Sequence, residues 1–123
     1  QALKGEIFTA FGEGSLTRSY CYVSDLILGF RRLMDSPPEI TGPTNLGNPE
    51  ELSVKDLAEL IIEMTGSKSE LISLPLPQDD PLQRRPDITM AREALGWKPS
   101  IPLSEGLQHT IQYFDEVLTA SAQ

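Results

Sequence analysis

Residues 6–23, EIFTAFGEGSLTRSYCYV, carry the first strand signals of this 123-residue chain. EIFTAF (6–11) and TRSYCYV (17–23) are β-prone runs of aromatic and β-branched residues. The GEGS between them contributes two glycines, which tolerate the backbone angles of a tight turn. The stretch therefore predicts a β-hairpin.

Helix signals dominate the chain beyond this stretch. Ser24 or Asp25 is expected to cap a helix that runs to about Met34. Ser53 and Asp56 resemble a capping box ahead of a second helix with apolar residues at i, i+3, i+4 and i+7. The other expected elements are a strand at PTNLGN (43–48), a helix end at Gly66, a strand at ELISLPL (70–76), a helix from Thr89 to Leu95, and a last helix from Leu103 or Ser104 with Leu107, Ile111, Phe114 and Leu118 on one face.

This order of elements predicts an α/β unit, or α+β if the chain is an isolated piece. Its length suits one domain spanning residues 1–123. Because two short strands cannot form a stable sheet alone, PTNLGN and ELISLPL are expected to join a sheet completed by the hairpin or by sequence outside the chain.

Composition narrows the function classes. Eighteen acidic residues outnumber ten basic ones, and the formal net charge of −8 argues against nucleic acid as a partner. The single cysteine, Cys21, excludes an internal disulfide framework and, without neighbouring ligands, a structural zinc site. No apolar run approaches the length of a membrane span. The N-terminal QALKGEIF lacks a methionine and is no signal peptide, so we expect a piece of something larger.

The segment DDPLQRRPDIT (79–89) places two adjacent arginines where proline disfavours a helix. Arginine pairs bidentately with phosphate oxygens, so Arg84 and Arg18 are candidate ligands of a diphosphate. Asp87 would then accept hydrogen bonds from sugar hydroxyls. Spacing alone leaves a second interpretation open, in which the loop only forms surface ion pairs, between Arg84, Arg85 and Asp87 and the neighbouring Asp79 and Asp80.

Other conspicuous side chains have plainer interpretations. The alternating aromatic residues of the hairpin, Phe8, Phe11, Tyr20 and Tyr22, could stack on a nucleobase or pack in a core. His109 is expected to be a surface or half-buried histidine, and Trp97 is expected to anchor the loop between the last two helices. The chain shows no glycine-rich dinucleotide fingerprint, activated nucleophile or metal-ligand spacing, so we assign it no catalytic, cofactor-binding or metal residues.

Three stretches together resemble the C-terminal, substrate-binding part of UDP-glucuronate decarboxylases (UDP-xylose synthases), which belong to the extended short-chain dehydrogenase/reductase family. They are FTAFGEGSLTRSYCYVSDL (8–26), TNLGNPEELSVKDLAELI (44–61) and PQDDPLQRRPDITMAREALGWKPSIPLSEGLQHTI (77–111). Related 4-epimerases and 4,6-dehydratases share the glycine turn with its arginine and the Arg-x-x-Asp pattern. NLGNPEE and QDDPLQRRPDI favour the decarboxylase branch.

The resemblance implies roles for particular residues. Arg18 and Arg84 would contact the UDP part of the substrate, with Asp87 placed for the ribose. The segment from Thr9 to Arg18, which includes Gly12, would line the nucleotide pocket. In that segment Phe11 stands where tyrosine is more usual and Leu16 where glutamine is more usual. Both departures remove polar groups that could hydrogen-bond the nucleotide.

The resemblance also implies a reaction and a cellular setting. Such enzymes use bound NAD to oxidise the sugar at C4, lose the C5 carboxylate as CO2 and return the hydride to give UDP-xylose. Their glycine-rich NAD loop and Tyr-x-x-x-Lys pair lie in an N-terminal half that this sequence does not contain. We therefore expect an inactive fragment of a cytoplasmic, homodimeric enzyme, with a UDP-sugar as its partner.

Two alternatives remain beside the decarboxylase. One is a nucleotide-sugar 4-epimerase or 4,6-dehydratase of the same family, and the other is a non-catalytic module that binds nucleotide sugars or a protein partner. A glycine-rich loop and Tyr-x-x-x-Lys upstream of Gln1 would exclude the second. If a larger domain is missing, apolar surface should be uncovered.

Overall fold

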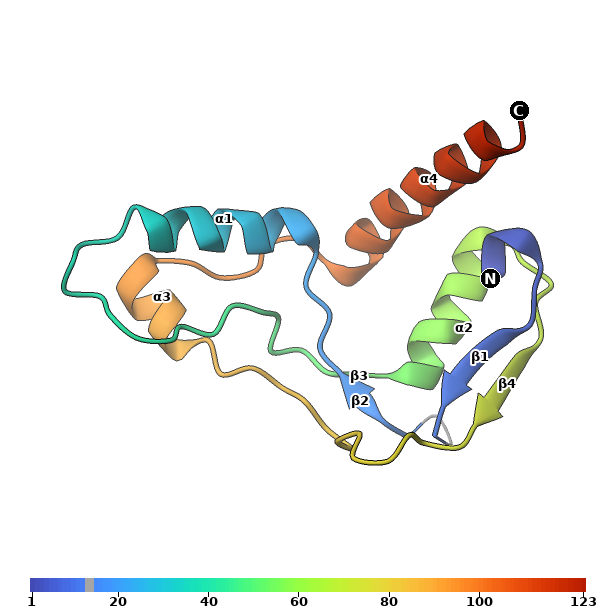
Figure 1. The fold of residues 1–123 in the computed structure, drawn as a ribbon, viewed down its shortest axis with the longest axis horizontal. Coiled ribbons are helices and arrows are strands. Elements are labelled where there is room, and N and C mark those ends of the chain that lie inside the picture. Colours follow the sequence, from blue (N-terminus) through green and yellow to red (C-terminus); the bar gives the residue numbers. More distant parts are fainter. Residues whose placement is uncertain (13–14) are drawn as a thin grey trace.

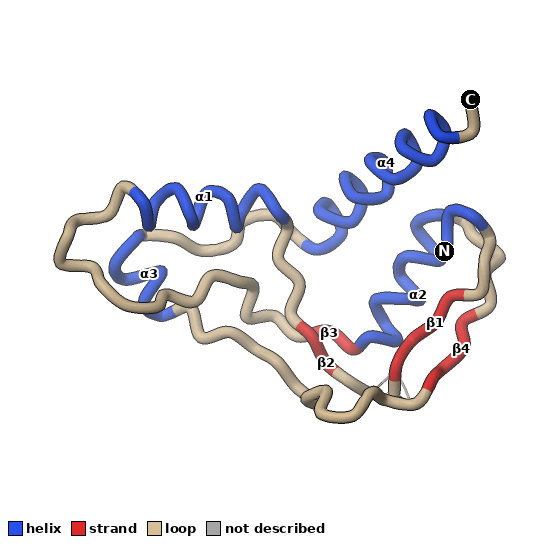
Figure 2. The backbone as a smooth tube through the Cα atoms, in the orientation of Figure 1, coloured by secondary structure: helices blue, strands red, loops and turns tan. Residues whose placement is uncertain are grey.

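The computed structural model describes residues 1–12 and 15–123 of the chain; Glu13 and Gly14, which belong to the expected GEGS turn, lie outside the described residues. The fold mixes short strands with helices (Figures 1 and 2). The elements in chain order are a 3-10 turn at Ala2–Lys4, β1 Phe8–Phe11, β2 Thr17–Arg18, α1 Val23–Met34, β3 Leu52–Ser53, α2 Val54–Thr65, β4 Leu71–Leu74, α3 Thr89–Leu95 and α4 Leu103–Ser121.

The strands do not form the hairpin that residues 6–23 predict. Instead β1 pairs in parallel with β4, with Phe8 opposite Leu71, and β2 pairs antiparallel with β3, with Thr17 opposite Ser53. The hydrogen bond from Gly12 N to Leu74 O extends the β1–β4 ladder by one residue. The prediction was wrong because strand propensity marks a strand but does not identify the neighbour that takes its backbone hydrogen bonds.

The predicted helices are confirmed, and local capping explains most of their ends. Ser53 Oγ accepts a hydrogen bond from Asp56 N at 3.0 Å at the start of α2, and Gly66 ends that helix with a φ of 62°. The expected cap of α1 was wrong, because its N-cap is Tyr22 and no side chain caps it. Asp25 lies in the first turn and uses its carboxylate elsewhere.

One of the two later strands is confirmed. ELISLPL contains β4, whereas PTNLGN contains no strand among the described residues. Residues 43–46 are instead an irregular segment that runs past α3 on its way to β3 (Figure 1). No described strand lies in register beside PTNLGN, so the pattern of a strand is present without its partner.

A small core sits where α1, α3 and the chain before α4 meet. Ile88, Ala91 and Trp97 form its buried centre, called here the Trp97 cluster; Trp97 is 1% exposed. The indole Nε1 donates to Asp25 O at 2.9 Å, which confirms Trp97 as the anchor between the last two helices.

The Asp25 carboxylate fastens the same region. Asp25 is 3% exposed, and its carboxylate accepts hydrogen bonds from Ser100 N, Ser100 Oγ and Ile101 N, each at 2.9–3.0 Å. Because both carboxylate oxygens accept hydrogen bonds, the charge is compatible with burial. The start of α4 is thereby tied to the first turn of α1.

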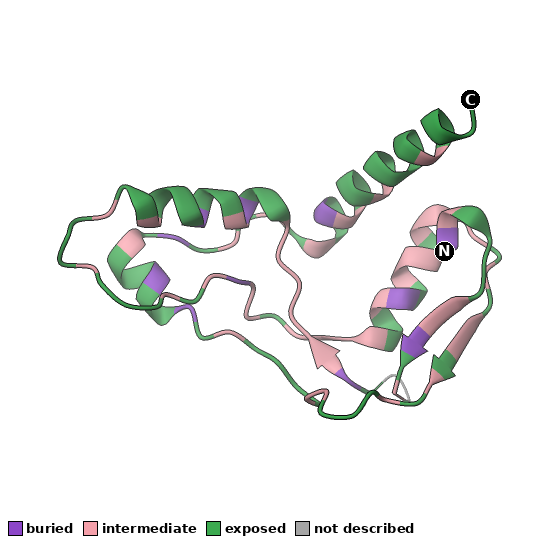
Figure 3. Ribbon diagram, viewed as in Figure 1, coloured by how far each residue is buried: buried purple, intermediate pink, exposed green. Residues whose placement is uncertain are grey.

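Outside these contacts the molecule is thinly packed. Figure 3 shows few buried positions and long exposed stretches on α1 and α4. Figure 1 shows α2, β1 and β4 gathered at one end, α1 and α3 at the other, and α4 projecting away from both. Among the described residues no helix is long and apolar enough to span a bilayer.

Candidate functional site

The loop of residues 79–87, called here the arginine loop, lies alongside β2. Thr17 forms an isolated parallel bridge with Gln83, and Thr17 N donates to Leu82 O at 3.2 Å. Two residues further along, Ser19 Oγ donates to Arg84 O at 3.2 Å. These contacts bring Arg84 next to the strand that carries Arg18, although the two residues are far apart in the sequence.

Glu51, which the sequence analysis did not select, holds the arginine loop against β2. Glu51 Oε1 accepts hydrogen bonds from Thr17 Oγ1 at 3.0 Å and from Gln83 Nε2 at 2.6 Å. Glu51 directly precedes β3, so the β2–β3 pair and the arginine loop share one acceptor. No local motif around Glu51 announces this role, because both of its partners come from distant segments.

The Arg18 guanidinium is held in place from two sides. Its Nη2 lies 2.7 Å from Asp80 Oδ1, and its Nη1 donates to Thr17 O at 2.8 Å. A turn in which Asp80 N donates to Pro77 O, with Asp79 at a φ of 66°, presents Asp80 to it. The arginine is oriented, and part of its donor fork stays available to a ligand.

Arg18 and Arg84 line the same cavity, of about 630 Å³. Within residues 1–12 and 15–123, neither Arg84 nor Arg85 forms an ion pair. The interpretation that the arginines pair with Asp79 and Asp80 was therefore wrong for this part of the chain, since Asp80 binds Arg18 instead. The cavity is lined by Arg18, Ser19, Asn45, Gln83, Arg84, Arg85 and Pro86.

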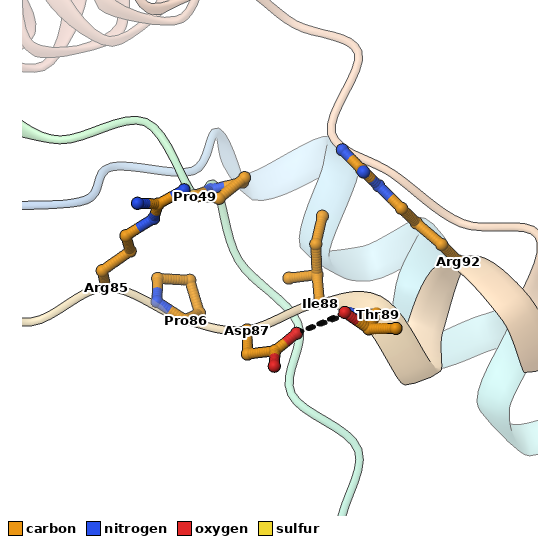
Figure 4. Close-up of a pocket in the computed structure, with 7 residues that line it drawn as sticks. All are labelled: Pro49, Arg85, Pro86, Asp87, Ile88, Thr89 and Arg92. Carbon is orange, nitrogen blue, oxygen red and sulfur yellow. Dashed lines mark hydrogen bonds between the residues drawn. The ribbon is translucent and has the colours of Figure 1, made fainter.

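Asp87 lines a neighbouring cavity, of about 400 Å³, together with Arg92 (Figure 4). Its Oδ1 accepts hydrogen bonds from Thr89 Oγ1 at 2.6 Å and Thr89 N at 2.9 Å. The Thr89 hydroxyl, then the Thr89 amide and the nearby Arg85 charge, lower the pKa of the Asp87 carboxyl below its usual value. Arg85 and Pro86 line both cavities, so Asp87 lies next to the arginine pair and outside its cavity.

The other predicted site residues lie towards β1. Thr9 is in the β1–β4 ladder, and its backbone N donates to Gln1 Oε1. Phe11 is 46% exposed, whereas Leu16 is only 3% exposed. Gly12 and Leu16 line a separate cavity of about 540 Å³. The structure thus brings Arg18 and Arg84 together in one cavity, and none of these four residues lines it.

Leu16 packs as a core residue here. Its Cδ1 lies 3.2 Å from the position that a Cβ on Gly12 would occupy, and Gly12 has a φ of 69°. A leucine in place of the more usual glutamine therefore fills apolar space. A side chain at position 12 would be strained by the positive φ and would crowd the end of Leu16.

Two further side chains that could take part in chemistry, Cys21 and His109, lie outside the arginine cavity. Burial, and secondarily the Asp25 charge, raise the pKa of the half-buried Cys21 thiol, which makes it a poorer nucleophile. Of the two environments predicted for His109, surface or half-buried, the structure shows the surface one, and its Nε2 lies 3.8 Å from Glu105 Oε1. No group of His, Cys, Asp and Glu in the described ranges could hold a metal ion.

Sequence comparison gives this geometry a context. No protein-family model matches the chain. UDP-glucuronic acid decarboxylase 1 of Danio rerio is 51% identical over 122 residues, which cover 99% of this chain and 29% of that protein. The chain matches the C-terminal part of the UDP-glucuronic acid decarboxylases. UDP-glucuronic acid decarboxylase 5 of Arabidopsis thaliana is 48% identical over 107 residues, covering 87% of this chain and 31% of the relative. The chain thus spans about 30% of the length of these decarboxylases.

Solved structures of extended short-chain dehydrogenases/reductases share the fold. UDP-glucose 4-epimerase of Thermotoga maritima, in complex with UDP-glucose, is 33% identical with a TM-score of 0.89, covering 95% of this chain and 37% of that one. UDP-glucuronic acid 4-epimerase of Bacillus cereus, in complex with UDP-glucuronic acid and NAD, is 28% identical with a TM-score of 0.87, covering 94% of this chain and 37% of that one. The prediction of the C-terminal part of an extended enzyme of this class is confirmed at the level of fold.

Proposed function

We propose that this chain is the substrate-binding part of an NAD-dependent UDP-glucuronate decarboxylase, and that Arg18 and Arg84 hold the diphosphate of the UDP-sugar. The observation that carries the proposal is their shared cavity, in which Arg18 is oriented by Asp80 and Arg84 has no ion-pair partner among the described residues. Two guanidinium forks suit the oxygens of a diphosphate. The 51% identity to a decarboxylase, against 33% to a 4-epimerase, favours loss of CO2 over epimerisation.

The charge of the cavity supports an anionic ligand. Asp80 neutralises Arg18, so the positive charge offered to a ligand comes mainly from Arg84 and Arg85. Asp87 in the adjoining cavity, held by Thr89, is proposed to face the ribose. NAD would supply hydride chemistry from the part of the enzyme that precedes the matched region, and this chain would bind and orient the sugar nucleotide.

Titration calorimetry with UDP tests the arginine site on the chain itself. Arg84→Ala should weaken binding about 10- to 150-fold, the equivalent of about 1.5–3 kcal/mol for a hydrogen bond to a charged group. Arg31→Ala, an exposed arginine on α1, is the matched control and should bind like the parent chain. Equal affinities of the two variants would remove Arg84 from the site.

A chimera tests the reaction. In it, this chain replaces the matched 122 residues of the Danio rerio relative. We expect CO2 release and UDP-xylose from UDP-glucuronate, and a lower kcat/KM after Arg84→Ala. A folded chimera that binds NAD and converts UDP-glucuronate only to its 4-epimer would identify an epimerase. A folded chimera that forms neither UDP-xylose nor the 4-epimer would support the alternative of a non-catalytic binding module.

A further inference from the structure

Arg18 and Arg84 are fixed in different ways. The Arg18 guanidinium is held directly, by Asp80 Oδ1 at 2.7 Å and by Thr17 O at 2.8 Å. Arg84 is exposed, and its side chain forms no ion pair among the described residues. The position of Arg84 beside Arg18 therefore depends on how the backbone of the arginine loop is docked on β2.

The register of that docking places the two arginines side by side. Thr17 of β2 and Gln83 of the loop form a parallel bridge, so the next residues along the two segments are Arg18 and Arg84. Neighbouring strands lie about 4.8 Å apart, and side chains at matching positions point to the same face. Both arginines line one cavity, as this register requires. A slip of one residue would turn Arg84 to the opposite face.

Glu51 connects the two segments at that bridge. A single carboxylate oxygen, Oε1, accepts hydrogen bonds from Thr17 Oγ1 on β2 at 3.0 Å and from Gln83 Nε2 in the loop at 2.6 Å. Thr17 directly precedes Arg18 in the sequence, and Gln83 directly precedes Arg84. The carboxylate thus ties together the two residues next to the arginine pair.

The hydrogen bonds to Glu51 are of the stronger kind. An ionised acceptor forms shorter and stronger hydrogen bonds than a neutral one, and water competes less at the half-buried Glu51. Two other contacts of the loop with β2 have neutral acceptors. They join Thr17 N to Leu82 O and Ser19 Oγ to Arg84 O, and both are 3.2 Å long. Glu51 therefore holds the register of the arginine loop more firmly than these neutral contacts do.

The charge and the hydrogen bonds of Glu51 act on an anionic ligand in opposite directions. A carboxylate near the arginine cavity repels a diphosphate, so its charge alone predicts tighter binding when the acid is removed. The hydrogen bonds predict the reverse, because a loop that is already in place lowers the entropy cost of binding. The sign of the change in affinity therefore separates the two effects.

We propose that Glu51 is a positioning residue for the diphosphate site, and that by fixing Arg84 beside Arg18 it makes the site selective for a nucleoside diphosphate over a nucleoside monophosphate. Two guanidinium groups at a fixed separation engage two phosphates at once, whereas a single phosphate needs only one of them. Glu51 acts through Thr17 and Gln83 and not by contact with the ligand. The inference rests on the proposed function, which places the diphosphate at the two arginines.

Amide hydrogen exchange in the absence of ligand tests whether Glu51 holds the loop. In Glu51→Ala, exchange at Thr17 N, which donates to the loop, should speed up at least about tenfold, whereas Phe8 N, which donates within the β1–β4 pair, should stay protected. Glu50→Ala is the matched control, because it removes the same charge from the neighbouring, exposed position. Equal exchange at Thr17 N in the two variants would overturn the proposal.

Titration calorimetry with UDP and with UMP tests what this contact does for binding. Glu51→Ala should weaken UDP binding about 3- to 10-fold, the cost of ordering one more long side chain, although the variant removes a negative charge. UMP binding should change less than about twofold, because one phosphate needs only one guanidinium group. Glu50→Ala should leave both affinities as they are. Tighter UDP binding in Glu51→Ala, or equal losses for UDP and UMP, would contradict the proposal.

Two further variants separate positioning from a general structural role. Glu51→Gln keeps Oε1 as an acceptor and should bind UDP within about twofold of the parent chain. In a chain that already carries Arg84→Ala, adding Glu51→Ala should cause less than about a twofold further loss, because the residue that Glu51 positions is absent. A glutamine variant as weak as the alanine variant, or a full additional loss in the double variant, would count against positioning.

The same variants distinguish failure of this role from failure of the proposed function. If the parent chain bound no UDP, or if Arg84→Ala bound it equally well, the proposed function and the role of Glu51 in it would fail together. If Arg84→Ala weakened UDP binding while Glu51→Ala bound UDP like Glu50→Ala, the role of Glu51 alone would be rejected.

Discussion

The Trp97 cluster and the arginine loop are adjacent in sequence and opposite in character. Ile88 is 4% exposed, whereas Asp87, one residue earlier, is exposed and so are Arg84 and Arg85. The cluster has its polar neighbours satisfied by the protein, while the loop keeps charged groups without ion pairs among the described residues. The comparison shows how a rigid core can fix one end of a loop whose charges remain available. Stability and binding should therefore respond to different substitutions.

Removing the indole at the centre of the cluster should have the largest effect. Trp97→Ala is expected to lower the free energy of unfolding by about 3–5 kcal/mol, because it leaves a cavity and deprives Asp25 O of its donor. Urea denaturation measures the change. Tyr113→Ala, at a side chain 61% exposed, is the control and should shift stability by no more than about 0.5 kcal/mol. Similar losses in both variants would mean that the cluster is not the core of the molecule.

Neutralising the buried carboxylate should rank second. Asp25→Asn replaces one acceptor oxygen by a donor that faces Ser100 and Ile101, and we expect a loss of about 1.5–3 kcal/mol in the same assay. Asp115→Asn, on the exposed side of α4, is the control. An Asp25→Asn variant as stable as the parent would show that Trp97 fixes the start of α4 without help.

The ion pair of the arginine loop should contribute less. Asp80→Asn is expected to cost less than about 1 kcal/mol, because the Arg18 and Asp80 side chains are 20% and 33% exposed and water screens their attraction. Added salt should narrow the difference further. If Asp80→Asn lowered the free energy of unfolding as much as Asp25→Asn does, the arginine loop would contribute to stability as the core does, and the two regions would not differ.

The smallest effect concerns the end of the loop. Thr89 lowers the pKa of the Asp87 carboxyl, so the stabilisation from this contact is present above the usual carboxyl pKa of about 3.9 and is lost as the pH falls through the lowered pKa. Thr89→Val should move the Asp87 midpoint upward in an NMR titration, and Thr89→Ser should preserve it. An unchanged midpoint in the valine variant would assign the shift to the Thr89 amide, which valine retains, and to Arg85.

Local chemistry was enough to predict the helices. Helix ends and helix faces are set by residues close together in the sequence. Examples are the Ser53 cap, the glycines at 66 and 96, and the apolar spacing of α4. Strand pairing was not predictable in this way. The hairpin and PTNLGN were misjudged because a strand depends on a neighbour that local sequence does not specify, and the neighbour of β1 lies at residues 71–74.

In the candidate site, too, local sequence indicated individual residues but not the distant residues that contact them. Arg18, Arg84 and Asp87 stood out because arginine and aspartate in a proline-rich loop are chemically conspicuous. Asp80 and Glu51, which orient the site, were not recognised in these roles because their partners lie 62 and 34 residues away along the chain. Leu16 was assigned to the nucleotide pocket, but it is buried and shares a cavity with Leu74, Leu76 and Leu82, a neighbourhood that no local motif reveals.

The parallel pairing of β1 with β4 has a consequence while the chain is being synthesised on the ribosome. Phe8 and Leu71 are 63 positions apart (71 − 8), so β1 leaves the ribosome long before its partner exists. At about 5–20 residues per second the wait is on the order of 3–13 s. During that interval the FTAF edge is open to other nascent chains. Substitutions in residues 71–74 that delay pairing should therefore lower the yield of soluble protein even where the finished fold tolerates them.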